Sequence, residues 1–382
     1  MRSLAQPLSL LKQHTNPVCR GFTTARGQAA VYGESGDPRS VLRVVDHHLP
    51  HELPSTGLLL RMLAAPVNPS DLNQIEGTYP VKGRFRAIRL ADNTTAEVAV
   101  GGNEGVAEVL KAGSGVSGVG VGDWVVPRRA GEFGTWCTHA VTSSEDVVRI
   151  PAEWHRGLDP LQVASIKVNP STGYRMLRDF ASLNEGDYVI QNGANSGVGR
   201  AVIQLAKPLG VRTINVVRDR ENFDELADEL HRLGADVVVR DKDLLSDDTK
   251  RRLKSLDAPV RLGFNCVGGR MTLAMTKFIS QGGTLVSYGG MSRQPVTLPT
   301  SLLLFKDIRA CGFWMNRWYD ALGDVGERDR MWEDILRLAQ ANKFVTQPMR
   351  RVEWRAGEDV SEVQEKVQGA AGWGAKHAFV FK

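Results

Sequence analysis

The chain has 382 residues, of which 42% are hydrophobic and 24% are charged. This composition is ordinary for a globular protein, and the length is enough for two domains. No apolar run approaches the ~18–20 residues that a membrane span needs, so we expect none. The four cysteines, Cys19, Cys137, Cys266 and Cys311, show no C-x-x-C spacing. The absence of this spacing argues against a zinc or redox site formed by neighbouring cysteines.

The first 33 residues carry four basic residues, Arg2, Lys12, Arg20 and Arg26, and no acidic one, in a chain of net charge +5. A basic, hydroxyl-bearing, acid-free leader is typical of a mitochondrial transit peptide, which we expect over residues 1–24. The protein is then expected in the mitochondrial matrix; a disordered tail is the alternative. Without the leader the chain is near neutral, so nucleic acid is not an expected partner.

Short β-like runs punctuated by glycine fill residues 29 to 150, as at 58–63, 105–110 and 124–126. Turn signals at this spacing predict a small, barrel-like β domain.

Strands and helices alternate after residue 150. Strands are expected at 188–191, 213–217, 236–239, 262–265 and 283–288, and helices at 163–180, 201–209, 223–233 and 331–341. This alternation predicts an α/β domain with a doubly wound parallel sheet. The chain ends in a β-like run at 378–381, and we expect this tail to pack on the first domain. The expected division is therefore 25–160 with 316–382, and 161–315.

A glycine-rich turn, residues 189–200, joins an expected strand to an expected helix. In this context glycines let the backbone approach the pyrophosphate of a dinucleotide, and the helix N-terminus stabilises its charge. The spacing departs from a strict G-x-G-x-x-G, and a turn that needs glycine only for its conformation is the alternative. The expected cofactor contacts are Gly193, Asn195, Ser196, Gly197, Val198 and Gly199.

The next expected strand ends in Arg218, Asp219 and Arg220. NAD sites usually place a carboxylate at this point for the ribose 2′-hydroxyl. Arginine instead pairs with a 2′-phosphate through two parallel hydrogen bonds. Arg218 and Arg220 therefore favour NADPH, and Asp219 is the feature that favours NAD.

Taken together, these motifs resemble the medium-chain dehydrogenase/reductase superfamily and, within it, the mitochondrial trans-2-enoyl thioester reductases. The supporting segments are 68–80 (Asn-Pro-Ser-Asp to Tyr-Pro), 101–105 (Gly-Gly-Asn-Glu-Gly), 122–125, 168–170, 215–220, 265–269 and 288–291. The resemblance implies a GroES-like, β-rich catalytic domain, a Rossmann domain and a homodimer. It also implies NADPH-dependent reduction of a trans-2-enoyl thioester, carried on acyl carrier protein or coenzyme A, in mitochondrial fatty acid synthesis.

Tyr79 is the catalytic residue that the resemblance implies. A phenol stays protonated at neutral pH and can donate a hydrogen bond to a developing oxyanion; whether Tyr79 or water gives the proton stays open. The other implied cofactor contacts are Asn169, Tyr288, Gly289, Gly290, Met291, Phe313, Trp314, Met315, Asn316 and Lys376. Without the resemblance, Tyr79 is an aromatic in a turn, Trp314 and Trp318 are core aromatics, and Lys376 is a solvated lysine.

Zinc-dependent relatives hold their metal with a cysteine and a Gly-His-Glu motif, whereas residues 101–105 contain no histidine. The loop of four close cysteines is also missing, so no metal is expected. Two alternatives stay open: a zinc-free NADPH quinone oxidoreductase, for which Tyr79 is dispensable, and a cofactor-binding regulatory protein without turnover. Residues 81–100 are longer and more charged than the family leads us to expect, and we predict a loop over the mouth of the site.

Overall fold

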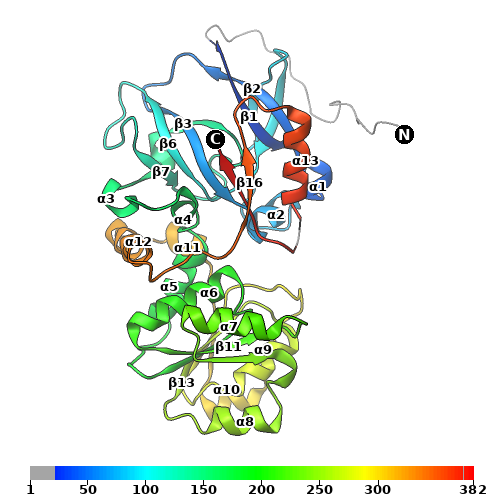
Figure 1. The fold of residues 1–382 in the computed structure, drawn as a ribbon, viewed down its shortest axis with the longest axis vertical. Helices are drawn as coiled ribbons and strands as arrows, with labels where there is room; N and C mark the ends of the chain where they lie inside the picture. The colour runs from blue at the N-terminus through cyan, green and yellow to red at the C-terminus, as the bar shows by residue number, and fades with distance from the viewer. Residues whose placement is uncertain (1–21, 373) are drawn as a thin grey trace, which may run out of the picture. The chain divides into compact units, whose positions relative to one another are not determined.

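The computed structural model describes residues 22–372 and 374–382, which form two compact units (Figure 1). The first unit runs to Ser165 and resumes at Pro348, and the second spans Ile166–Gln347. The expected transit peptide lies outside the described residues except for 22–24, which belong to the first strand. Among the described residues, no helix has the length and apolar character that crossing a bilayer requires.

The first unit is built from two antiparallel-rich sheets. Its strands are β1 (Phe22–Tyr32), β2 (Arg43–Pro50), β3 (Gly57–Pro66), β4 (Arg86–Arg89), β5 (Thr95–Val100), β6 (Val106–Ala112), β7 (Trp124–Pro127), β8 (His139–Ser143), β9 (Val147–Ile150), β16 (Arg350–Trp354) and β17 (His377–Phe381). Its helices are α1 (Pro38–Val41), α2 (Pro69–Ile75), α3 (Ala152–His155), α4 (Pro160–Ala164) and α13 (Val360–Ala370). The strand orders are β2-β1-β5-β4 and β16-β17-β3-β6-β7-β9, with β8 also paired to β3.

Buried and exposed side chains alternate along β3, the central strand of this unit. Leu58, Leu60 and Met62 of β3 are buried in the core, and Arg61 between them is exposed. This period of two places every second residue on one face of the sheet. Strand β17 pairs with β3 on one side and with β16 on the other, so the end of the chain completes the first unit, as the sequence predicts.

The prediction of a loop at residues 81–100 was wrong, because β4 and β5 form a hairpin there. Ile88, Ala96 and Val98 alternate toward the core, and Asn93 takes the left-handed conformation (φ 69°) in the turn. Alternating apolar residues around an Asp-Asn turn are a hairpin signal that the charged residues of the segment obscured.

A six-stranded parallel sheet forms the second unit. Its strands are β10 (Tyr188–Asn192), β11 (Arg212–Val217), β12 (Val237–Arg240), β13 (Val260–Asn265), β14 (Thr284–Ser287) and β15 (Arg309–Gly312), in the order β12-β11-β10-β13-β14-β15. The order reverses between β10 and β13, which is the arrangement of a dinucleotide-binding, doubly wound sheet. The predicted fold class is therefore confirmed for this unit.

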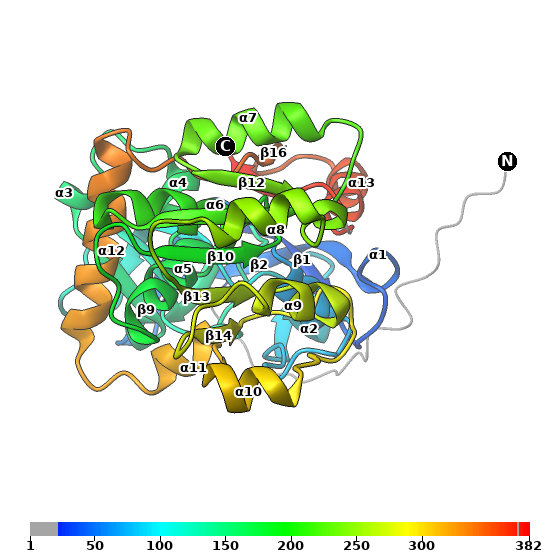
Figure 2. The same cartoon turned by 90° about the horizontal axis from the view of Figure 1, so that it is seen from below.

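Helices cover both faces of this sheet, as Figure 2 allows the reader to follow. The helices of the second unit are α5 (Asn169–Asp179), α6 (Gly197–Ala206), α7 (Phe223–Leu233), α8 (Asp247–Lys254), α9 (Gly269–Thr276), α10 (Thr300–Lys306), α11 (Met315–Asp320) and α12 (Val325–Gln340). One apolar cluster joins the sheet to α8 and α9, and another joins it to α6 and α7.

Two predicted boundaries differ from the structure. The single helix expected at 163–180 is divided into α4 and α5, because Pro170 opens α5 and cannot continue a preceding helix. The second unit extends to Gln347 rather than to residue 315, since α12 packs against α5 of the same unit.

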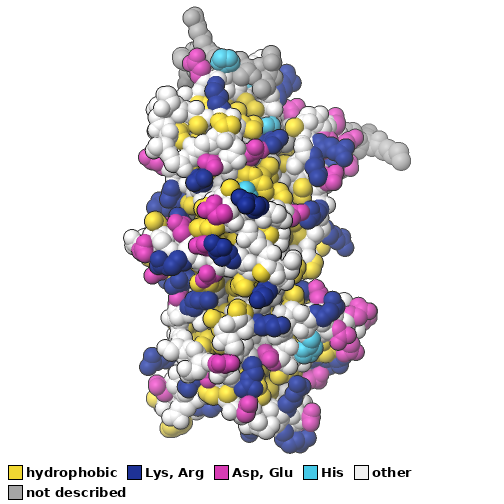
Figure 3. Space-filling model, turned by 60° about the vertical axis from the view of Figure 1, so that its left-hand side comes forward, with side chains coloured by type: hydrophobic (Ala, Val, Ile, Leu, Met, Phe, Trp, Pro, Cys, Tyr) yellow, Lys and Arg dark blue, Asp and Glu magenta, His cyan; other side chains and the backbone are white. Residues whose placement is uncertain are grey.

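Acidic and basic side chains are interspersed on the described part of the face drawn in Figure 3. A face of mixed sign differs from the continuous basic surface with which proteins bind the phosphates of nucleic acids.

Candidate functional site

The carboxyl edge of the parallel sheet gathers most of the predicted cofactor residues. Gly193 follows β10, Arg218 follows β11, Tyr288 follows β14 and Phe313 follows β15. The strands are parallel, so these ends lie at one edge, where open α/β sheets bind their ligands.

Three glycines shape the turn between β10 and α6. Gly193 is left-handed (φ 61°), and a Cβ there would lie 2.5 Å from Cys266 Sγ. A Cβ at Gly199 would lie 2.5 Å from the carbonyl oxygen of Ala194. A Cβ at Gly197 would lie 2.8 Å from the side chain of Asn169. The structure therefore brings Asn169 to the glycine turn.

Ser196 begins α6 by accepting a hydrogen bond from the amide of Gly199 at 3.1 Å. Asn195 and Ser196 are partly exposed, whereas Val198 is buried. Backbone amides at the start of a helix favour an anionic group, so the turn can hold a pyrophosphate.

The segment Tyr288–Met291 is tied to the neighbouring strand ends. The amides of Tyr288 and Met291 donate to the carbonyls of Asn265 and Cys266, both at 2.9 Å. Burial raises the pKa of the Tyr288 hydroxyl well above its usual value; the nearby Cys266 thiol adds to this rise, and Ser196 opposes it. Gly289, Gly290 and Met291 are exposed. Tyr288 therefore packs toward the glycine turn, and the rest of its loop faces solvent.

Asp219 is engaged by two cations of the same unit. Its carboxylate lies 2.8 Å from Lys242 Nζ and 3.7 Å from Arg240 Nε. The hydrogen bond from Lys242 holds the pKa of Asp219 below its usual range. Arg218 is exposed and Arg220 partly so. Two arginines and one aspartate therefore follow β11, and the aspartate is already paired with Lys242.

Residues 313–316 continue from the edge strand β15. The amide of Phe313 donates to the carbonyl of Ser287 at 2.9 Å, and its ring meets Phe180 edge-on at 5.7 Å. Phe313 and Met315 are buried, whereas Trp314 and Asn316 are partly exposed.

The first unit contains a buried polar network that joins two of the motif segments. The carboxylate of Asp71 accepts from the backbone amide of Asn68 (2.8 Å) and from the amide and side chain of Asn103 (3.1 and 2.8 Å). The side chain of Asn103 also donates to Gln74 at 3.0 Å, and that of Asn68 donates to Glu104 at 2.8 Å. All five side chains are buried. The sequence prediction did not include this network, although both motifs supplied its members.

Lys376 belongs to the same network rather than to solvent. Its Nζ lies 3.5 Å from Asn68 Oδ1, and burial lowers its pKa, against the raising effects of Asp71 and Glu104. Burial also raises the pKa of Asp71 to about 6, while its hydrogen bonds and Lys376 hold it down. Lys376 is thus the cation of a buried acidic cluster.

Tyr79 lies in the turn that leaves α2. The amides of Thr78 and Tyr79 both donate to the carbonyl of Asn73, at 2.9 and 3.1 Å, and Gly77 between helix and turn is left-handed (φ 79°). The side chain of Tyr79 is half-buried. The helix that carries Asp71 and Gln74 therefore also fixes the backbone of Tyr79.

Tyr79 and Lys376 are part of the first unit, and the other predicted site residues are part of the second.

A catalytic zinc does not fit the residues at the motif position. Asn103 stands where zinc-dependent relatives have histidine, and its amide nitrogen is used as a donor to Asp71 and Gln74. Among the described residues, no group of three or more His, Cys, Asp or Glu is placed to hold a metal ion.

Two family models match the chain. Residues 54–152 match the alcohol dehydrogenase GroES-like domain, and residues 197–328 match the zinc-binding dehydrogenase model. They confirm the GroES-like and Rossmann pairing that the sequence predicts.

Similar proteins and solved structures show to which branch of this superfamily the chain belongs. The mitochondrial enoyl-acyl-carrier-protein reductase of Xenopus tropicalis is 43% identical over 331 residues, which are 86% of this chain and 89% of the relative. A solved complex of Etr1p with NADP and crotonyl-CoA is 33% identical with a TM-score of 0.84, over 94% of this chain and 100% of the other. The mitochondrial 2-enoyl thioester reductase Etr1p/Etr2p heterodimer from Candida tropicalis is 32% identical with a TM-score of 0.85, over the same shares. The chain belongs to the family of mitochondrial enoyl-acyl-carrier-protein reductases.

Proposed function

We propose that this protein is a mitochondrial NADPH-dependent reductase of trans-2-enoyl thioesters, which produces saturated acyl thioesters for fatty acid synthesis. One enoyl thioester, one NADPH and one proton give one saturated thioester and one NADP⁺. The observation that carries the proposal is the buried network of Asn68, Asp71, Asn103 and Glu104, which joins two motif segments beside the turn of Tyr79. The family relationship supports the same activity.

The second unit fits NADPH at the carboxyl edge of its sheet. The backbone amides where the glycine turn enters α6 can hold a pyrophosphate. At Gly290, no atom apart from those of its chain neighbours lies within 4 Å of a built Cβ. Arg218 and Arg220 would hold the 2′-phosphate, since Asp219 is already paired with Lys242. When bound, NADPH supplies the hydride that reduces the β carbon of the substrate.

In the proposed mechanism Tyr79 stabilises the charge that develops on the thioester oxygen. A protonated phenol can donate a hydrogen bond there, and a positioned donor of this kind contributes about a hundredfold to turnover. Tyr79 suits this role because its backbone is fixed to α2 through the carbonyl of Asn73. The α carbon then takes a proton from Tyr79 or from water.

Oxidation of NADPH, followed by the absorbance of the reduced nicotinamide, tests the proposal. Crotonyl-CoA should be reduced, and a small quinone should not. Turnover of the quinone alone would favour the quinone oxidoreductase alternative, and turnover of neither would favour the regulatory one.

Tyr79→Phe tests the mechanism. It should lower kcat about a hundredfold and leave the affinity for NADPH unchanged. Tyr188→Phe is the matched control, because Tyr188 begins β10 and is separated from the glycine turn by the length of the strand. It should keep its turnover. Full activity in Tyr79→Phe would refute the role given to this phenol.

We further propose acyl carrier protein as the substrate carrier and a homodimer as the assembly. The name of the Xenopus tropicalis relative supports the carrier, and the Candida tropicalis heterodimer supports an assembly of two chains. A lower KM for crotonyl-acyl carrier protein than for crotonyl-CoA is the expected result.

A further inference from the structure

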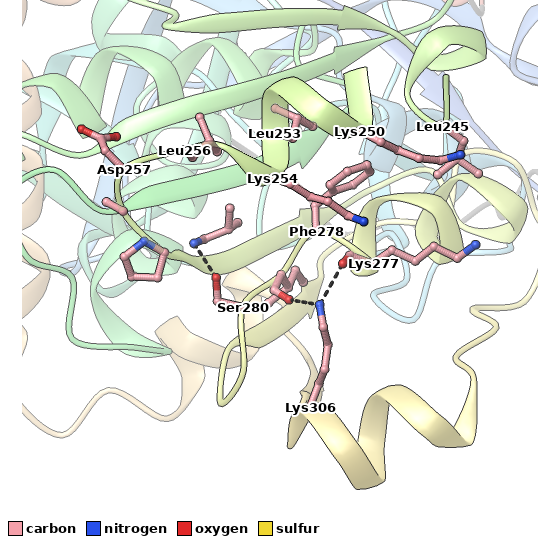
Figure 4. A pocket seen from close by; sticks show the side chains of 14 residues that line it. Leu245, Lys250, Leu253, Lys254, Leu256, Asp257, Lys277, Phe278, Ser280 and Lys306 are labelled. Carbon is pink, nitrogen blue, oxygen red and sulfur yellow. Dashed lines mark hydrogen bonds between the residues drawn. The ribbon is translucent and has the colours of Figure 1, made fainter. Parts of the chain in front are cut away.

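Two cavities within single units lie apart from the residues described above. The cavity in the second unit, about 720 Å³, has four lysines around an apolar floor (Figure 4). Lys306 there donates to the carbonyls of Lys277 and Ile279, both at 2.9 Å. Its ammonium group therefore already has acceptors within the protein.

The cavity in the first unit has a volume of about 620 Å³ and carries arginines instead of lysines. It is lined mainly by β2, β8 and the β4–β5 hairpin, and this hairpin is the segment that the sequence singles out as unusually charged. Its lining residues with ionisable side chains are His47, His48, Arg86, Arg89, Cys137 and His139. Among the described residues that line it, none is Asp or Glu.

Arg86 is the partly buried cation of this cavity. A long hydrogen bond of 3.5 Å joins its Nη1 to the carbonyl of Val141. Burial is the main cause that lowers the pKa of the Arg86 guanidinium. The acidic side chain of Asp146, which acts on it from a distance, bonds to Thr142 and Ser143 instead. A partly buried guanidinium with no carboxylate beside it is a site at which an anion can pair with the charge.

The neighbouring groups do not supply that negative charge. Burial raises the pKa of the Cys137 thiol to about 12, so the thiol is neutral at neutral pH. Burial lowers the pKa of His47 to about 4, and it also lowers the pKa of His139. Both imidazoles are then neutral, and they offer polar groups without adding charge. Arg86 and Arg89 carry the permanent positive charges of the cavity lining.

We propose that this cavity binds a small organic anion, whose carboxylate or phosphate group pairs with Arg86 and whose apolar part packs against Leu49 and Ile88. The planar guanidinium can hold two oxygens of such a group at once. The cavity volume is within the range of small-molecule sites, about 300–1,000 Å³. The cavity shares no residue with the network around Asp71.

Thermal unfolding of the full chain tests this site, with inorganic phosphate and hexanoate as probes against chloride at equal ionic strength. A ligand at about a hundred times its Kd should raise the Tm of the wild type by about 5 °C. A shift with hexanoate alone identifies a carboxylate with an apolar tail, and a shift with phosphate alone identifies a phosphate compound.

Arg86→Met is the decisive variant. Phosphate stabilises folded proteins without binding to them, so the readout is the difference between the wild type and this variant. The variant should lose the probe-specific shift. In chloride it should be at least as stable as the wild type, because a partly desolvated charge without a carboxylate partner has been removed. Arg86→Lys keeps the charge but loses the two-oxygen geometry, and should bind at least tenfold more weakly; this variant decides the matter if Arg86→Met fails to fold.

Arg84→Gln is the matched control, because it removes the same charge from an exposed position two residues away. It should keep the full shift. The proposal is overturned if neither probe shifts the wild type, if Arg86→Met or Arg86→Lys shifts as much as the wild type, or if Arg84→Gln loses the shift equally.

Discussion

The side-chain amide of Asn103 donates a hydrogen bond of 2.8 Å to the carboxylate of Asp71, and both groups are buried. Asp71 lies on α2, and Asn103 lies in the glycine-rich segment that follows β5. Lys376, just before the last strand, is the cation of the same cluster. Three distant parts of the sequence therefore share one electrostatic environment, and the stability of the first unit should depend on their protonation.

Lys376→Met should extend this dependence on pH to higher pH. The folded pKa of Asp71, about 6, lies above the 3.8 of an unperturbed aspartate. Asp71 therefore favours folding most below pH 4, and its contribution is lost as the pH rises toward 6. Because Lys376 lowers this pKa, its removal moves the upper end of the window above pH 6. Each unit by which the folded pKa of Asp71 rises then lowers the free energy of unfolding at pH 7 by about 1.4 kcal/mol.

Urea unfolding between pH 4 and 8 measures the effect. Lys382→Met, at the exposed end of the chain, should follow the wild type; equal curves for both variants would contradict the prediction.

Gly199→Ala should disrupt the glycine turn. The new methyl group would meet the backbone of Ala194, which cannot move without displacing the turn. We expect the Kd for NADPH, measured by fluorescence titration, to rise at least tenfold. Gly369→Ala is the control, because a Cβ there has no neighbour within 4 Å and the residue is in α13. It should increase stability by about 1 kcal/mol. An unchanged NADPH affinity in Gly199→Ala would show that the turn does not approach the cofactor.

Arg218→Ala should reduce the preference for NADPH over NADH. The loss of hydrogen bonds to a charged phosphate is worth about 1.5–3 kcal/mol, which is about 10–100-fold in the KM for NADPH. The KM for NADH should stay constant. Arg252→Ala removes an exposed arginine of α8 and should change neither constant. A parallel change for both cofactors would place Arg218 away from the 2′-phosphate.

Phe305→Glu should convert the proposed dimer to monomers. Strand β15 is the edge of the parallel sheet, and α10 beside it exposes Leu304 and Phe305 by 69% and 79%. An open edge next to exposed apolar side chains is a surface for a second chain. Light scattering after gel filtration gives the mass. Val121→Glu changes another exposed apolar residue, 71% accessible, in the first unit and should leave the mass unchanged. A dimeric Phe305→Glu variant would exclude this surface.

Lys306→Met should destabilise the second unit by about 1–2 kcal/mol. The lysine satisfies two carbonyls at the end of α9, and a methionine leaves both without this donor. Chemical unfolding measures the loss. Lys254→Met, on the exposed rim of the same cavity, should change stability by less than about 0.5 kcal/mol. Similar effects of the two substitutions would mean that the carbonyl contacts of Lys306 contribute little.

The sequence predicts the elements that carry strong local signals. Strands β10 to β14 are short apolar runs between helical segments, and each was expected within a few residues of its place. Edge strand β15 was missed, because Arg309 and Ala310 are exposed and show no buried pattern. The hairpin at 86–100 was not predicted, because the charged residues of this segment are more typical of a loop.

The buried network could not be predicted from local pattern. Asp71 and Asn103 are 32 residues apart, and Lys376 and Asn68 are 308 apart. The pairing of β17 with β3 places Lys376, which precedes β17, beside the buried network of the first unit. From the residue type alone, Asn, Glu and Lys at these positions are expected on the surface of the protein.

The placement of β17 between β16 and β3 has a consequence for dividing the chain into fragments. The second unit is one continuous stretch, Ile166–Gln347, so a single fragment contains all of it. No single fragment that ends at Ser165 contains the whole first unit, because β16 and β17 of its larger sheet come from residues 348–382. Such a fragment leaves residues 64–66 of β3 without the partner strand that β17 supplies.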